Sequence, residues 1–591
     1  EEHHLVKIVL AELQKMESDD ERFEAKVTVL IENVRHHVEE EEGELFPMVR
    51  DELGRNALGE LGDAMAAAKA SAPTHAHPRS PDTPPANLVV GTAAGVIDRV
   101  TDTVSGVVQG GSSITQQYAE RYYFDETVST LRGKLQETVL ASPRVNVAIE
   151  ERARERGRSA EAARAEAEKM FREIAANMNS TFLAVLNVIV TAVFRRVFVS
   201  IETSGLEKVA AYAKRHPVVL VPSPRSYFDF LLLSVLFYAH HLVPPHIASR
   251  ENMGFGPFGF IFRRAGAFFM RKSFDDPLYK EVFRAYVEYL VREGFTQEFF
   301  IEGTRSRTGR TMAPKRGFLS WDVDGFLASQ RRDLFFVPIA ITYERLIEEG
   351  SMLDELSGGA KKDESMLGLV RARKVLRRRW GSAHISFGEP ISLADSIGDR
   401  RAQFALEATE EDTADKRRFV DDLAQRVVER INAATFANTT AVAACAFLGE
   451  TRRGMLRHEL TRRMQEIVAL LRLQDARLTP ALLRDQPDFD DAVAFLLRSD
   501  LIEAAPDPRG EILFYEEGKR RVLDIYRNGI LHFLAPPSFL ARRLLAGASQ
   551  DALRDDLRFW LDLFHNELFT QRPLVLAAHF EAFLDYFERL E

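Results

Sequence analysis

The stretch VVLVPSPRSYFDFLLLS, residues 218–234, predicts a strand, a turn and a helix in succession. A short apolar run begins at Val218, a Pro-Ser-Pro segment interrupts it, and a second apolar run follows from Phe228. Ser226 is a favourable N-cap, and Asp229 stands three residues later at capping-box spacing, which directs its side chain back toward residues 224–226. The turn also leads into a helix N-terminus, whose free backbone N–H groups suit an anion. We therefore expect the chemistry of the chain at this turn.

Three further blocks accompany this stretch in order: GAFFMRKSF (266–274), FFIEGTRSRTGR (299–310) and VPIAITYE (337–344). Together the four blocks resemble the glycerolipid acyltransferases, and most closely the glycerol-3-phosphate and dihydroxyacetone-phosphate acyltransferases. The resemblance extends over roughly residues 120–590 and is strongest over 218–393. Residues 364–376 and 381–393 look more like the dihydroxyacetone-phosphate branch, whereas YRNGILHF (526–533) resembles the C-terminal region of bacterial glycerol-3-phosphate acyltransferases.

The fold class we predict is α/β, with a glycerolipid-acyltransferase-type sheet covered by helices and with helical N-terminal and C-terminal regions. Short apolar runs alternate with amphipathic helices between residues 201 and 430, which favours such a sheet. The four blocks should lie in turns after strands, at one edge of the sheet. The predicted domains are a partial hemerythrin-like segment (1–70), a proline-rich linker (71–86), a helical accessory region (87–200), the acyltransferase core (201–430) and a mostly helical C-terminal domain (431–591).

The first block departs from the family pattern. That pattern is His-x-x-x-x-Asp, and the His position here is Pro224, while Asp229 remains. Proline has no proton-accepting side chain, and loss of a general base typically slows a reaction by about a hundred- to ten-thousand-fold. Asp229, acting directly or through a water, is the replacement base we favour; Glu302 and the pair His240 and His241 are the alternatives. A capping role for Asp229 without catalysis also fits the spacing.

The third block supplies the groups for an acceptor phosphate. Two guanidinium groups in one turn, those of Arg305 and Arg307, can bind a phosphate bidentately. Surface ion pairing of the same arginines is the alternative. The resemblance implies that these positions bind the acceptor and that Glu302 helps to place it. By the same resemblance, the substrate-binding residues are Arg271, Lys272, Gly303, Arg305, Ser306, Arg307, Lys315 and Pro338; an ordinary structural proline at 338 would look the same.

Composition limits the classes of function. The formal net charge of -10 disfavours general binding of nucleic acid. The single cysteine, Cys445, excludes an internal disulfide and lies in an apolar run typical of a buried thiol. The longest apolar run, residues 182–194, is too short to span a bilayer. We expect a protein peripheral to the cytoplasmic face of the membrane.

Residues 1–70 read as two helices with apolar side chains at helical spacing. His37 and Glu41 are four residues apart, so they share a helix face and suit one metal ion. The stretch resembles the last two helices of a hemerythrin-like domain, which implies iron ligands at His3 or His4, His37 and Glu41. An acidic, solvated helix surface is the alternative.

The function predicted from the resemblance is transfer of a long-chain acyl group to the 1-hydroxyl of glycerol 3-phosphate, making lysophosphatidic acid for phospholipid synthesis. The donor would be acyl-CoA or acyl carrier protein, the transfer itself needs no cofactor, and a membrane surface is an expected partner. Three alternatives stay open: a dihydroxyacetone-phosphate acyltransferase, a catalytically silent homologue that regulates a partner, and a membrane-surface protein. The last would use the cationic residues 371–379 with Trp380.

Overall fold

The computed structural model describes residues 22–40, 43, 47, 135–178, 180–226, 228–240, 242–254, 256–349, 352, 378–407, 413–484 and 489–590. Residues 1–117 and 118–591 form two compact units. In the first unit the structure describes helix α2 (Phe23–Glu40). The predicted iron ligands His3 and Glu41 and the linker 71–86 lie outside the described residues, and of His37 only its backbone in α2 is described.

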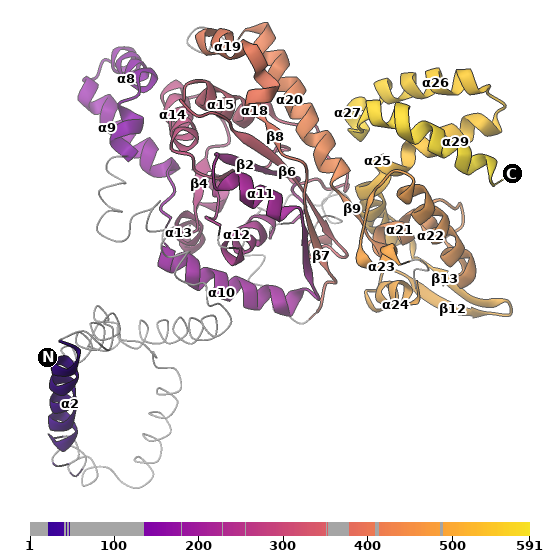
Figure 1. Cartoon of the computed structure of the whole chain (residues 1–591), viewed down its shortest axis with the longest axis horizontal. Coiled ribbons are helices and arrows are strands. Elements are labelled where there is room, and N and C mark those ends of the chain that lie inside the picture. Colours follow the sequence, from indigo (N-terminus) through magenta and orange to yellow (C-terminus); the bar gives the residue numbers. More distant parts are fainter. Residues whose placement is uncertain are drawn as a thin grey trace. The chain divides into compact units, whose positions relative to one another are not determined.

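The second unit is built on a mixed sheet that the helices cover on both faces (Figure 1). Among the described residues the sheet has eight strands in the order β1-β7-β6-β2-β5-β3-β4, with β8 also paired to β6. Strands β6, β2, β5, β3 and β4 run parallel, and β7 runs antiparallel to β6. The strands are β1 (Ile201–Ser204), β2 (Val218–Pro222), β3 (His246–Arg250), β4 (Ala267–Met270), β5 (Gln297–Glu298), β6 (Phe335–Tyr343), β7 (Ala383–Phe387) and β8 (Ile391–Ser392).

The side chains of β2 alternate between two buried clusters, because successive side chains of a strand point to opposite faces of the sheet. Val218 and Leu220 pack with α12 (Asp229–Ala239) and α10 (Ser180–Val197). Val219 and Val221 pack with α14 (Pro277–Glu293), α15 (Arg316–Leu327) and α20 (Ala414–Ala433). The short helices around the sheet are α11 (Leu206–Ala213), η2 (Glu251–Met253), α13 (Gly256–Arg264), α18 (Leu393–Ile397), η3 (Gly398–Arg400) and α19 (Arg401–Glu407).

Before the sheet, α8 (Pro143–Arg156) and α9 (Ala160–Ile174) form a helical hairpin that packs on α14. The charged stretch that contains them was predicted as helical, and the structure divides it at Gly157, whose φ of 59° ends α8 in a left-handed C-cap. Ser159 then caps α9 by accepting a hydrogen bond from the Ala162 N–H. The described part of the accessory region is therefore helical, as predicted.

The C-terminal region shares its core with the sheet domain. One cluster of buried side chains joins Leu220 and Leu233 to Phe447, Leu523 and Tyr526, across the boundary predicted at residue 430. The sequence EAAPDPRGEILFYEEG (503–518) predicts a β-hairpin, which the antiparallel pair β12 and β13 confirms. The elements are β9 (Phe436–Ala437), α21 (Thr439–Leu448), β10 (Gly454–Leu456), α22 (Arg457–Arg472), β11 (Arg477–Leu478), α23 (Pro480–Leu483), α24 (Asp490–Arg498), β12 (Glu503–Asp507), β13 (Gly510–Phe514), η4 (Glu517–Lys519), α25 (Arg520–Leu545), α26 (Gln550–Leu563), α27 (His565–Leu568), α28 (Arg572–Leu574), η5 (Val575–His579) and α29 (Phe580–Glu588).

The α/β prediction is confirmed, with corrections. The fourth block forms most of β6 instead of a turn after a strand. The apolar run EFFIEG (298–303), one of the runs that favoured the sheet, contributes only Glu298 to β5, and the chain then turns at Gly303, whose φ is +67°. Helix α12 begins at Asp229 with Phe228 as its N-cap, so Ser226 lies before the cap.

The structure also bears on the predictions for Cys445 and for the membrane contact with Trp380. Cys445 is buried, as expected, and burial raises the pKa of its thiol to about 12. Trp380 is also buried, with the Arg345 guanidinium over its ring, which removes the aromatic residue proposed for a membrane contact. Residues 371–377 of that cationic cluster lie outside the described residues. None of the helices in the described residues has the length and hydropathy needed to cross a bilayer.

Candidate active site

The turn between β2 and α12 is organised by the Asp229 carboxylate, as the sequence predicts. Its Oδ2 accepts hydrogen bonds from the backbone N–H of Arg225 at 2.6 Å and of Ser226 at 2.8 Å. Its Oδ1 accepts a hydrogen bond from the Tyr343 hydroxyl at 2.6 Å. The carboxylate is fully buried, and it fixes the backbone directly after Pro224.

Burial raises the pKa of Asp229 to about 7, because desolvation of the charged form outweighs the hydrogen bonds from Tyr343, Ser226 and Arg225. The pKa of the Tyr343 hydroxyl is raised well above its ordinary value, first by burial and then by the charge of Asp229. Tyr343 therefore acts as a neutral hydrogen-bond donor to Asp229. A carboxyl with a pKa near 7 suits a general base at neutral pH.

Glu302 lies on the other side of the turn and is also buried. Its Oε1 accepts a hydrogen bond from the Ser223 hydroxyl at 2.6 Å, and its Oε2 accepts one from the Met312 N–H at 3.0 Å. Burial raises the pKa of Glu302, whereas the nearby Arg225 guanidinium lowers it. Both carboxylate oxygens are thus engaged in holding two loops together, which favours a supporting role for Glu302.

The predicted phosphate residues lie in the loop after β5. Arg305 faces the carboxylate of Glu348 at 3.8 Å, and both side chains are about one-tenth exposed. The Ser306 hydroxyl is buried and has no hydrogen-bond partner among the described residues, and Arg307 is partly exposed. Since the loop combines two guanidinium groups with an unsatisfied hydroxyl, it can bind a phosphate.

Gly303 marks the start of this loop and lies between two cations. The side chain of Lys315 passes over it, so that a Cβ at position 303 would lie 2.8 Å from the Lys315 Cδ. The Arg250 guanidinium donates a hydrogen bond to the Gly303 carbonyl at 2.8 Å. Arg250 was not singled out in the sequence, because it is a single cation at the end of β3, a strand that the alternation of apolar runs did not predict.

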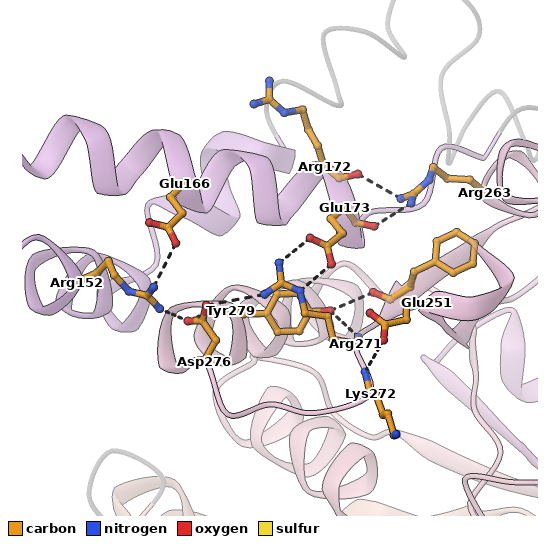
Figure 2. A network of polar contacts seen from close by, with 11 residues as sticks. Arg152, Glu166, Arg172, Glu173, Glu251, Arg263, Arg271, Lys272, Asp276 and Tyr279 are labelled. Carbon is orange, nitrogen blue, oxygen red and sulfur yellow. Dashed lines mark hydrogen bonds and ion pairs between the residues drawn. The ribbon is translucent and has the colours of Figure 1, made fainter. Parts of the chain in front are cut away.

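The second cationic pair has other partners. The Arg271 guanidinium donates to the Glu173 carboxylate of α9 at 2.8 and 2.7 Å, and it stacks over the Tyr279 ring at 4.1 Å. Figure 2 shows Arg271 directed toward α9, whereas the Lys272 ammonium group points away from the other labelled residues. These contacts fit docking of the α8–α9 hairpin. A phosphate-binding role for Arg271 and Lys272 stays a prediction of the resemblance.

The remaining predicted positions differ in how near they lie to the turn. Pro224 is buried. Pro338 is buried in β6, between the residues that pair with β8 and those that pair with β7. The missing N–H of the proline therefore costs no hydrogen bond on the β7–β8 side of the strand. His240 is exposed at the far end of α12, roughly 16 Å along the helix from Asp229, so it is excluded as a replacement base. His241 lies outside the described residues.

Two buried groups near the turn were missed from the sequence. Glu298 in β5 is fully buried, and its carboxyl oxygens have no hydrogen-bond partner among the described residues. Burial, and after it the charge of Asp229, raise the pKa of Glu298 well above its ordinary value, which favours the neutral carboxyl. His532 of α25 lies 3.0 Å from the Asn432 carbonyl, and its pKa is lowered to about 3 by burial and then by the charge of Arg225. Nothing local in the sequence places either group beside the first block.

A pocket with about 530 Å³ of empty space adjoins the turn. Its polar lining includes Arg225, Ser306, Tyr343 and Asn438, and its apolar lining includes Ile341 of β6, Leu346, and Ile525 and Ile530 of α25. Because the Tyr343 hydroxyl binds Asp229, the pocket lies next to the proposed base.

The comparisons with known proteins agree with this geometry. Residues 200–342 match the family model described as Acyltransferase, which places the first three blocks and most of the fourth in the class of acyltransferases. Residues 352–591 match the model of the glycerol-3-phosphate acyltransferase C-terminal region.

Curated relatives show which acyltransferases this chain is similar to. The glycerol-3-phosphate acyltransferase of Pseudomonas fluorescens strain Pf-5 is 33% identical over 465 residues, which cover 77% of this chain and 55% of that protein. The protein of the same name from Ectopseudomonas mendocina is 34% identical over 421 residues, 69% of this chain and 50% of that protein. The chain belongs to the glycerol-3-phosphate acyltransferase family. It spans about half the length of the curated relatives it matches.

Among solved structures, the chain is similar to the 1-acyl-sn-glycerophosphate acyltransferase of Thermotoga maritima. The match covers 43% of this chain and 82% of that one, with 15% identity and a TM-score of 0.25, which is too low to support an inference.

Proposed function

We propose that this chain transfers an acyl group from an acyl thioester to a hydroxyl of glycerol 3-phosphate. The observation that carries the proposal is the combination of a buried carboxylate with a pKa of about 7 at Asp229 and the arginine loop after β5. Proton abstraction and phosphate binding are the two tasks that the acceptor requires.

In this proposal Arg305 and Arg307 bind the acceptor phosphate, and Lys315 adds charge beside Gly303. Asp229 takes the proton of the attacking hydroxyl through a water next to Pro224, because the carboxylate is fully buried and the proline carries no proton acceptor. The hydroxyl oxygen attacks the thioester carbonyl and forms a tetrahedral intermediate. The C–S bond then breaks, and the leaving sulfur takes up the proton that Asp229 accepted, so that a free thiol is released and Asp229 is again deprotonated.

The acyl chain of the donor is proposed to enter the pocket beside Tyr343, since a lining that exposes more apolar than polar surface suits an acyl chain. Acyl-CoA and acyl carrier protein are both candidate donors. We also propose peripheral contact with the membrane, because the donor and the product partition toward lipid.

Product formation from labelled glycerol 3-phosphate and long-chain acyl-CoA tests the proposal, with dihydroxyacetone phosphate as the competing acceptor. We expect labelled lysophosphatidic acid from glycerol 3-phosphate, and a rise of at least about tenfold in the acceptor KM for Arg305→Ala, since charged hydrogen bonds contribute about 1.5–3 kcal/mol. No product from either acceptor would refute the proposal. Product from dihydroxyacetone phosphate alone would reassign the acceptor.

A further inference from the structure

We propose that helix α25 of the C-terminal region positions the acceptor-phosphate loop, residues 303–311, and that Asn528 is the main positioning residue. The inference rests on the proposed function, because it takes this loop as the phosphate site. It assigns a task in the reaction to a region 220 residues further along the chain than the loop itself.

The contact is direct at the centre of the loop. The Asn528 Nδ2 donates a hydrogen bond to the Thr308 carbonyl at 2.8 Å. The next residue, Gly309, has a φ of +79°, and a Cβ there would lie 2.0 Å from the Ile525 carbonyl. Ile525 and Asn528 are three residues apart on α25, so they present one face of the helix to the loop. At Gly309 the loop backbone therefore lies against α25 with no room for a side chain.

The same loop is held from the side of the first block. The Arg225 guanidinium donates to the Gly309 carbonyl and, at 3.5 Å, to the Thr311 hydroxyl. The Thr311 hydroxyl donates to the Asn432 Oδ1 of α20 at 2.5 Å. The loop is thus fixed between the catalytic turn and α25, and each contact limits movement in a different direction.

Helix α25 also supports the segment that faces Arg305. The Tyr526 hydroxyl accepts a hydrogen bond from the Leu346 N–H at 3.0 Å and donates one to the Glu349 carboxylate at 2.9 Å. Glu348 in this segment lies 3.8 Å from Arg305. Helix α25 therefore contacts both the loop that carries the arginines, through Ile525 and Asn528, and the segment that carries their acidic neighbour, through Tyr526.

A phosphate site gains affinity when its cations are already in place, because ordering a free loop on binding costs free energy. Loss of the Asn528 contact should therefore weaken acceptor binding more than it slows the chemical step. One hydrogen bond of this kind corresponds to about a two- to tenfold change.

The test compares the native chain with Asn528→Leu, which keeps the approximate shape and removes the donor, and with Asn528→Ala. Ser538→Ala on the exposed side of α25 is the matched control. The readouts are amide hydrogen exchange of residues 303–311, the KM for glycerol 3-phosphate and for the acyl donor, kcat, and the thermal unfolding midpoint.

We expect both Asn528 variants to exchange faster in residues 303–311 and to raise the acceptor KM two- to tenfold, with kcat and the donor KM within about twofold of the native values. Gly309→Ala, which must displace the loop from Ile525, should raise the acceptor KM further. Unchanged exchange would overturn the inference whether or not the chain is active. So would an unchanged acceptor KM in an active chain, even with a lower unfolding midpoint. A native chain that forms no product from either acceptor would instead refute the proposed function.

Discussion

At the scale of single residues, the chemistry depends on how Asp229 is surrounded. Its carboxylate accepts three hydrogen bonds, yet the absence of solvent raises its pKa to about 7. The sequence predicted its direction, because a capping-box acid reaches back to the residues before its helix. It did not predict Tyr343, which lies 114 residues away in β6.

The Asp229 pKa sets a pH dependence. A general base acts when it is deprotonated, so kcat/KM should rise as the pH increases through about 7 and level off above it. Asp229→Asn should lower kcat at least a hundredfold and abolish the rise. Steady-state rates between pH 5.5 and 9 measure both effects. Native-like rates in Asp229→Asn would show that the carboxylate only caps the turn.

We expect Glu298 to affect the stability of the fold and not the rate of the reaction. Its carboxyl is buried without a partner among the described residues, and its pKa is raised well above the ordinary value. For an acid with a raised pKa in the folded state, the folded state binds more protons than the unfolded state once the pH exceeds the ordinary value of 4.5. The folded chain therefore keeps this contribution to its stability below pH 4.5 and loses it as the pH rises toward the folded-state pKa of Glu298.

Glu298→Gln removes this titration. Relative to the native chain, the free energy of unfolding of Glu298→Gln should increase between pH 5 and pH 8 by about 1 kcal/mol or more. Urea unfolding at the two pH values measures it, with the exposed Glu207→Gln as the control. A difference between variant and native that does not depend on pH would show that Glu298 is ionised in the folded chain.

At the scale of elements, the α8–α9 hairpin is attached by a network of charged side chains. Arg152 of α8 pairs with Glu166 of α9 and with Asp276 at the start of α14, and Arg271 pairs with Glu173 (Figure 2). Arg263 of α13 donates to the Ala175 and Glu173 carbonyls and so satisfies the end of α9. The α8–α9 hairpin therefore contacts the second block of the family pattern through Arg271.

We expect Arg271 to contribute more to this attachment than to acceptor binding. The two side chains of the Arg271–Glu173 pair are 32% and 38% exposed, so solvent screening limits their coupling to about 0.5–1 kcal/mol. A double-mutant cycle of Arg271→Ala and Glu173→Ala by urea unfolding should give this value. Arg271→Ala should leave the acceptor KM within about twofold of the native value. A tenfold rise in that KM with no coupling energy would restore Arg271 to the phosphate site.

The sequence predicts elements well where local chemistry decides them. The amphipathic pattern over 279–293 predicts a helix, and α14 ends at Glu293 with Asp276 as its N-cap, Pro277 in its first turn and Gly294 as a left-handed C-cap. Strand β3 was missed because HIASR has polar side chains at both ends. The partners of Arg271 could not be predicted, since Glu173 lies 98 residues earlier and only the tertiary structure brings the two together.

At the scale of the whole molecule, the C-terminal region and the sheet domain form one folding unit around a shared core. A sequence read as consecutive domains does not predict this, because apolar residues such as Leu523 do not reveal which partner covers them. The arrangement places α25 beside the phosphate loop and the pocket beside Tyr343.

We propose that this site transfers acyl groups although Pro224 stands at the family's histidine position. The most direct measurement is product formation from labelled glycerol 3-phosphate and acyl-CoA by the native chain, Pro224→His and Asp229→Asn. We expect the native chain to form well more product than Asp229→Asn, and Pro224→His to form about a hundred- to ten-thousand-fold more than the native chain, because an imidazole there would bridge Asp229 and the acceptor. A native chain no more active than Asp229→Asn, beside an active Pro224→His, would contradict it and identify a binding protein that has lost its base.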